Sequence, residues 1–232
     1  MPSGWTGAVT PSKTGYTFSP PSKDYSTSPV LSNLTNQDYA ATATNYSATL
    51  KSSAAQDGWI LESSRTSSKG GSMNAKATTI NLGDDAARKQ YLGILSFDTG
   101  AALPDNAVVT SIILKLKKQS VVGGGNPVAI FKGFMADIKN GSFNLPTLEV
   151  KDFQTAASGS YGPIITSPSA TGWYSLDLSA GSAFINDLGL TQIRLRFKLG
   201  DNNNAIANTL AIFSGNAPAA SQPQLTITYH LP

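Results

Sequence analysis

The chain has 232 residues, among them 21 Gly, 13 Pro and no Cys. Only 13% of the residues are charged, and the net charge at pH 7 is +3. This length suits one large all-β domain or a domain with an appendage, and the missing Cys excludes disulfides, thiolate metal ligands and thiol nucleophiles. No apolar run approaches the ~20 residues of a membrane span, and the first residues lack the basic start and apolar core of a signal peptide, so an exported protein would have lost its signal before this numbering begins.

Residues 1–55 differ from the rest of the chain. They contain 19 Ser or Thr and 5 Pro but only 5 Val, Leu or Ile, with aromatic residues scattered among them. Such a segment buries too little apolar surface to fold alone. It is therefore expected to be an extended arm, and two readings stay open: a linker within a longer surface protein, or an arm that docks on a neighbouring subunit.

From residue 56 to residue 232 the pattern is one of short strands with turns between them. Most of the strands alternate apolar and polar residues, which favours antiparallel pairing with one wet face. The sequence therefore predicts an all-β fold, an antiparallel β-sandwich of jelly-roll type with roughly nine or ten strands. The expected strands are GWILESS (58–64), TTINLGDD (78–85), KQYLGILSFD (89–98), VVTSIILKLKKQ (108–119), VAIFKGFM (128–135), GWYSLDLS (172–179), TQIRLRFKL (191–199), NTLAIFSG (208–215) and PQLTITYHL (223–231). Residues 136–172 are expected to be irregular, and 182–189 to hold one short helical turn.

Few residue types that support catalysis are present. The single histidine, His230, is two residues from the end of the sequence, and Glu occurs only twice beside 12 Asp. Without a second His or a Cys, a catalytic triad or a zinc site is nearly excluded, and nothing in the sequence pairs two carboxylates as a glycosidase would. We therefore expect a protein that is not an enzyme.

Acidic turns offer candidate calcium ligands, since Ca²⁺ prefers carboxylate, amide and carbonyl oxygens on flexible loops. Asp57 precedes the first strand, Asp84 and Asp85 follow the second, and Asp201 opens the run DNNN. The alternative is that these side chains cap their own backbone in the turns.

Basic residues gather in the second half of the chain. The strand at 108–119 carries Lys115 and Lys117 opposite its apolar face, and QIRLRFKL (192–199) carries Arg194, Arg196 and Lys198. If the two strands are neighbours, five cations crowd one solvent face, and the cost of like charges side by side indicates an anionic partner. If they are not neighbours, each row only provides solubility and edge protection.

The order of several blocks resembles a known family. AAQDGWILESS, the run INLGDDAARKQYLGILSFDTGAALPDNAVVTSIILKLKKQ, QIRLRFKLGDNNN, IFSGNA and PQLTITYHLP are similar to the DNRLRE-type, disaggregatase-related β-sandwich modules, which include the family 96 carbohydrate-binding modules. The resemblance covers about residues 54–232, and close relatives are C-terminal domains of secreted or surface proteins of Chloroflexota-like bacteria. It implies a jelly-roll-like sandwich that binds or scaffolds, in some members on acidic polysaccharide such as alginate. Basic residues would make those contacts, here at Lys115, Lys117, Arg194 and Arg196, whereas the asparagines at 202–204 stand where relatives carry acids.

These observations favour a non-catalytic module, extracellular or on a prokaryotic cell surface, that binds polysaccharide, with an acidic one preferred because Arg and Lys suit carboxylates. The alternative is a structural subunit of an extracellular filament or sheath, in which the arm adds a strand to a neighbouring copy. Nucleic acid fits poorly, because the net charge is small and no aromatic platform lies within the basic strands.

Overall fold

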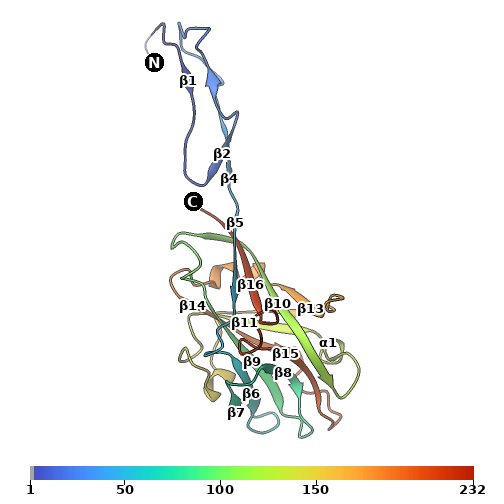
Figure 1. Ribbon diagram of the computed structural model, residues 1–232. Helices are drawn as coiled ribbons and strands as arrows, with labels where there is room; N and C mark the ends of the chain where they lie inside the picture. Colours follow the sequence, from blue (N-terminus) through green and yellow to red (C-terminus); the bar gives the residue numbers. More distant parts are fainter. Residues whose placement is uncertain (1–2) are drawn as a thin grey trace.

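A computed structural model describes residues 3–232 and shows an almost entirely β protein. A β-sandwich forms the body, and a narrow arm built from the N-terminal residues projects from one end of it (Figure 1). The antiparallel all-β fold expected from the alternating strands is confirmed. None of the helices in the described residues is long and apolar enough to cross a membrane.

Twelve strands of the described chain form one curled antiparallel sheet that makes both layers of the body. They are β5 (Tyr46–Lys51), β6 (Gly58–Glu62), β7 (Gly70–Asn74), β8 (Thr79–Asp84), β9 (Gln90–Asp98), β10 (Val108–Val122), β11 (Phe134–Asn140), β12 (Gly159–Ile164), β13 (Trp173–Asp177), β14 (Leu190–Phe197), β15 (Asn208–Phe213) and β16 (Gln224–His230). β5 lies within the segment that the sequence assigned to the arm, and it pairs with β16 as an edge strand of the body.

The long strand β10 belongs to both layers. Its first part pairs with β13 and β16, and its last part pairs with β15, with a register shift between Lys118 and Ser120. An irregularity of this kind bends a strand and lets one sheet curl into two layers. We call β13–β10–β16–β5 the smaller sheet. The larger sheet is β12–β11–β14–β9–β8–β15, in which β6 also pairs with β9 and β7 pairs with β6.

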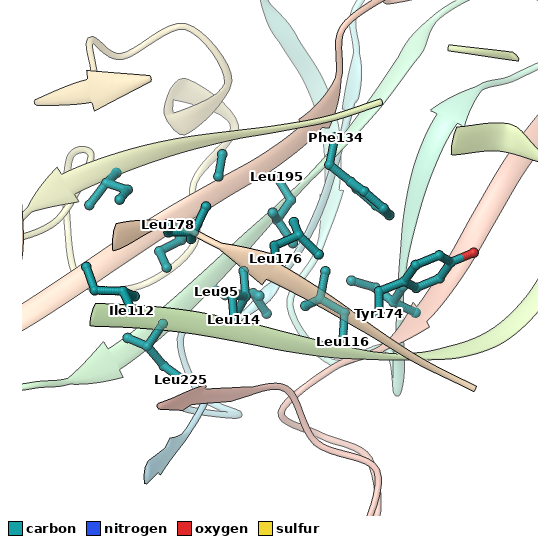
Figure 2. Packing of buried hydrophobic residues seen from close by; sticks show 14 of the residues in the cluster. Leu95, Ile112, Leu114, Leu116, Phe134, Tyr174, Leu176, Leu178, Leu195 and Leu225 are labelled. Carbon is teal, nitrogen blue, oxygen red and sulfur yellow. The ribbon is translucent and has the colours of Figure 1, made fainter. Parts of the chain in front are cut away.

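The main core lies between the two sheets, where the inward residues of each strand meet (Figure 2). Leu114 and Leu176 from the smaller sheet and Leu95 and Leu195 from the larger one are all buried there. A second, smaller apolar cluster lies on the outer face of the larger sheet, beneath the segment 141–158; its buried members are Ile60, Leu92, Ile94, Phe143, Leu148 and Phe153. The larger sheet is therefore covered on both faces over part of its area.

The arm is a ribbon of short antiparallel strands, β1 (Ala8–Val9), β2 (Tyr16–Ser19), β3 (Lys23–Asp24) and β4 (Ala40–Ala43). β1 pairs with β3 and β2 pairs with β4, and the chain then runs directly into β5. At the junction the rings of Tyr46 and Tyr229 stack with centroids 5.7 Å apart. Leu231 packs against Gly15, where an added Cβ would come within 3.0 Å of the Leu231 Cβ.

Three local features of the structure differ from the expected pattern, and one expected helical turn is present with shifted bounds. The stretch 128–135, expected as a strand, begins with a short helix, α1 (Pro127–Ile130), because the Asn126 side chain accepts a hydrogen bond from the Val128 amide and Pro127 suits a first helical turn. The region expected to be irregular contains β12, most of β11 and a 3₁₀ turn, η1 (Val150–Phe153). The expected turn near residue 182 is η2 (Ser179–Phe184). β7 was not predicted, since its GGSMN lacks both apolar alternation and β-branched residues.

Candidate functional site

The cationic row of β14 does not face solvent as one unit. Arg194 is only 8% exposed; its Nε donates to Asp137 Oδ2 on β11 at 2.9 Å, and its Nη2 forms an ion pair with the same oxygen at 2.9 Å. Its Nη1 donates to the carbonyl oxygens of Asp152, Phe153 and Thr155, at 2.8–3.0 Å. Arg194 therefore fastens the covering segment 141–158 to the larger sheet.

The two other cations of that row lie differently. Arg196 is partly exposed and donates from Nε to Asp137 Oδ2 at 3.1 Å, whereas Lys198 follows the end of β14 and is exposed. Burial alone would raise the pKa of Asp137, but the Ser160 hydroxyl and the two guanidinium groups outweigh it and hold that pKa below its usual range. One buried carboxylate thus serves two arginines, which makes this a structural ion-pair network.

The alternative in which the two basic strands are neighbours and five cations share one solvent face is wrong. β14 lies in the larger sheet, whereas Lys115 and Lys117 lie on the part of β10 that belongs to the smaller sheet. Strict alternation correctly separated the two faces of each strand, but it could not show that the outer face of β14 is covered by another segment.

The candidate calcium ligands are distributed over two places. Asp57 is fully buried and accepts hydrogen bonds from the amides of Ser96 and Gly215. Burial raises the pKa of Asp57 to about 7 despite these hydrogen bonds. Asp57 therefore joins three chain segments and lies apart from the other three carboxylates.

Asp84, Asp85 and Asp201 lie near one another at the loop that follows β14. Asp84 accepts hydrogen bonds from two backbone amides of that region, and burial raises its pKa, with a further contribution from the charges of Asp201 and Asp85. Asp201 pairs with Arg88 at 2.6 Å, and Asp85 pairs with Lys89 at 3.5 Å. Within residues 3–232 no three Asp, Glu or His side chains form a group that could hold a metal ion, and calcium binding here stays a prediction.

The outer face of the smaller sheet is a continuous polar surface made of cross-strand rows. The pairing registers define three such rows: Lys51, Gln224, Lys115 and Ser175; Thr49, Thr226, Ile113 and Asp177; and Ser47, Thr228 and Ser111. A fourth, shorter row places Lys117 opposite Trp173. The sequence prediction that Lys115 and Lys117 point away from the core is confirmed, since the alternating residues Leu114 and Leu116 are fully buried. We call this surface the polar face.

A shallow open depression of about 360 Å³ lies on the polar face beside Trp173. Its other lining residues are Lys115, Ser169, Thr171, Ser175 and Gln224. The ammonium of Lys117 lies 5.8 Å from the Trp173 ring centroid and donates to the Ser221 hydroxyl at 3.3 Å, so this lysine is held in place beside the ring. Lys115 is exposed, and none of the ion pairs among the described residues involves it. Its charge is therefore accessible from solvent.

Sequence reasoning missed Trp173, Lys51 and Gln224. The signal for Trp173 was present, because alternation in WYSLD places Trp173, Ser175 and Asp177 on one side of the strand. Nothing local placed Lys51, since its strand lies within the compositionally polar N-terminal segment. Only the pairing of β5 with β16 brings it onto the polar face.

A second hollow, of about 430 Å³, lies on the arm. Tyr25 and Tyr39 line it, together with Leu31, which is 74% exposed, and Leu34, which is 47% exposed. Exposed Leu side chains beside aromatic rings form an apolar surface of the kind that mediates contacts between proteins.

No family model matches the chain, and no curated protein matches it in sequence.

Proposed function

We propose that this protein is a non-catalytic module, extracellular or at the cell surface of a prokaryote, that binds polysaccharide on the polar face. The observation that carries this proposal is the position of Trp173 beside the free ammonium of Lys115, in a depression otherwise lined by hydroxyl and amide groups. An indole ring offers a flat apolar surface for the C–H face of a sugar. Hydroxyl and amide groups can both donate and accept hydrogen bonds, as sugar hydroxyls require.

The shape of the site also supports a polymeric ligand. Pockets for small molecules enclose most of their ligand, whereas this depression is open and continues into polar rows across four strands. A chain molecule can lie along such a surface without being enclosed.

The charge of the polar face favours an acidic polysaccharide. Lys51 and Lys115 share the first row, and Lys117 lies in the Trp173 row. The only carboxylate in these rows is Asp177, whose oxygen accepts hydrogen bonds from the amide and hydroxyl of Ser179. Carboxylate or sulfate groups on a sugar chain would pair with these ammonium groups. The resemblance to DNRLRE-type modules agrees with binding and not catalysis.

Affinity electrophoresis in gels that contain an acidic polysaccharide tests the proposal. Trp173→Ala and Lys115→Gln should each reduce retardation, because the first removes the ring and the second removes the accessible charge. Lys76→Gln, at an exposed position outside the polar face, has the same charge change and should be retarded like the parent. Equal retardation of all four proteins would show that the polar face does not bind the polymer.

A second candidate function is self-assembly into a filament or sheath through the arm. The exposed Leu31 and Leu34 beside the arm hollow favour it, because an apolar surface on an arm that projects from the body (Figure 1) is available to a neighbouring copy. Negative-stain microscopy of the full chain tests it directly. Filaments that disappear in a Leu31→Ser, Leu34→Ser variant would support assembly, and monodisperse particles for the parent would exclude it.

A further inference from the structure

The row of the polar face that contains Lys51 and Lys115 places these two cations on alternate strands. Lys115 on β10 pairs with Gln224 on β16, and Gln224 in turn pairs with Lys51 on β5. The three strands lie side by side (Figure 1). Adjacent strands are about 4.8 Å apart, so the backbone positions of the two lysines are separated by about 10 Å, with a neutral amide between them.

One strand spacing is close to the length of one pyranose residue in an extended sugar chain. A chain that crosses the strands along this row would therefore place successive sugars over Ser175, Lys115, Gln224 and Lys51. Only the second and fourth of these positions carry a positive charge, and the position between them offers an amide that can donate to and accept from sugar hydroxyls.

Neighbouring groups reinforce this charge pattern. The adjacent row contains a hydrogen-bonded pair of hydroxyls, Thr49 and Thr226, 3.1 Å apart, and ends in the carboxylate of Asp177. The hydrogen bonds from Ser179 hold the pKa of Asp177 below its usual range, so this group is negative at neutral pH and disfavours a ligand anion beside it. Anionic groups are therefore directed to the Lys51–Lys115 row.

We propose, on the basis of the proposed function, that the polar face recognises a polysaccharide that presents one anionic group at every second sugar. Such a chain runs across the strands, with one sugar stacked near Trp173 and anions on Lys115 and Lys51. Two sources share this chemistry: a copolymer in which an acidic and a neutral sugar alternate, and an acidic homopolymer whose twofold ribbon turns every second carboxylate toward the protein.

Calorimetric titration with defined oligosaccharides tests this proposal. The probes are di-, tetra- and hexasaccharides of alternating glucuronate and N-acetylglucosamine, and β-1,4-linked mannuronate oligomers of the same lengths. We expect the tetrasaccharides to bind more tightly than the disaccharides because they reach both lysines. Lys51→Gln should weaken tetrasaccharide binding by about threefold to fivefold, the usual effect of one exposed ion pair, and should leave disaccharide binding unchanged.

Each outcome bears on the proposal. If Lys51→Gln loses affinity only for the alternating oligosaccharides, the ligand is an alternating copolymer. If it loses affinity equally for both series, the polar face also accepts the acidic homopolymer. If Trp173→Ala and Lys115→Gln weaken binding while Lys51→Gln binds tetrasaccharides like the parent and like Lys76→Gln, the proposed spacing is wrong although the proposed function holds. If no probe binds the parent, and neutral glucan oligomers also fail to bind, the proposed function itself is overturned.

Discussion

Arg194 and Asp137 face each other across neighbouring strands, and two nitrogens of the guanidinium lie 2.9 Å from the same carboxylate oxygen. Both side chains are almost completely buried. The remaining Nη1 of Arg194 supplies three carbonyls of the covering segment 141–158 with a donor. This one residue therefore couples the outer face of the larger sheet to the loop above it.

Replacing Arg194 should destabilise the fold strongly. Arg194→Gln leaves Asp137 with Arg196 and the Ser160 hydroxyl only, and it leaves buried carbonyls without their donor. The change should cost about 2–4 kcal/mol of unfolding free energy. Urea denaturation of parent and variant measures the difference. Lys198→Gln, at an exposed position just after the end of β14, should change the free energy by less than about 0.5 kcal/mol. Similar small values for both variants would show that the network contributes little.

Asp57 should make the protein less stable as the pH rises. Its folded-state pKa is about 7, above the usual 3.8, so between roughly pH 4 and pH 7 the folded state binds a proton that the unfolded state has lost. The contribution of protonated Asp57 to the free energy of unfolding is fully present below pH 4 and is lost as the pH rises through 7. Its upper limit is about 4 kcal/mol. Asp84 and Asp152 also have raised pKa values, whereas Asp137 and Asp201 have lowered ones, so parent and variant must be compared.

Asp57→Asn isolates this contribution. The amide keeps an oxygen acceptor but does not ionise, so the variant should lose less stability than the parent between pH 5 and pH 7.5. Thermal melts of both proteins across this range provide the measurement. Parallel curves for the two proteins would mean that Asp57 ionises in the folded and unfolded states alike.

Calcium, if it binds, should bind weakly at Asp84 and Asp201. Arg88 pairs with Asp201 at 2.6 Å, and Ca²⁺ has to displace it. We therefore expect a calcium dissociation constant near the millimolar values of weak extracellular sites. At about 10 mM Ca²⁺ the melting temperature should then rise by about 3–6 °C. Asp84→Asn should abolish the rise. A parent protein that melts at the same temperature in Ca²⁺ and in EDTA would show that the site is absent.

The orientation of the arm should depend on Gly15. A Cβ at this position would meet Leu231 at 3.0 Å, and the φ of +79° disfavours a β-branched residue. Gly15→Val should therefore detach the arm from the C-terminal residues, which small-angle scattering would detect as a changed radius of gyration and limited proteolysis as faster cleavage near residue 45.

Gly4 provides the matched control for this prediction. It has a similar φ of +81°, but no atom of residues 3–232 lies within 4 Å of an added Cβ, so Gly4→Val introduces the backbone strain without the collision with Leu231. Scattering curves that change equally in both variants would attribute the effect to backbone strain and not to the contact with Leu231.

Much of the fold followed from local pattern. Alternation correctly assigned the inward residues of β10 and β16, such as Leu114 and Leu225, and the outward position of Lys115. These assignments succeed because successive side chains of a strand point to opposite faces whatever the strand pairs with. The same rule applied to WYSLD would have placed Trp173 on one side of its strand with Ser175 and Asp177, but this was not predicted.

What lies on the outer face of a strand was decided only by the tertiary structure. Arg194 and Lys115 have the same local pattern, but the segment 141–158 buries the first and solvent surrounds the second. Likewise, the row that joins Lys115 to Lys51 depends on pairing between strands more than 50 residues apart in the sequence. Alternation carries no information about partners, because a strand's register with distant segments and the loops that cover it are set by packing of the whole chain.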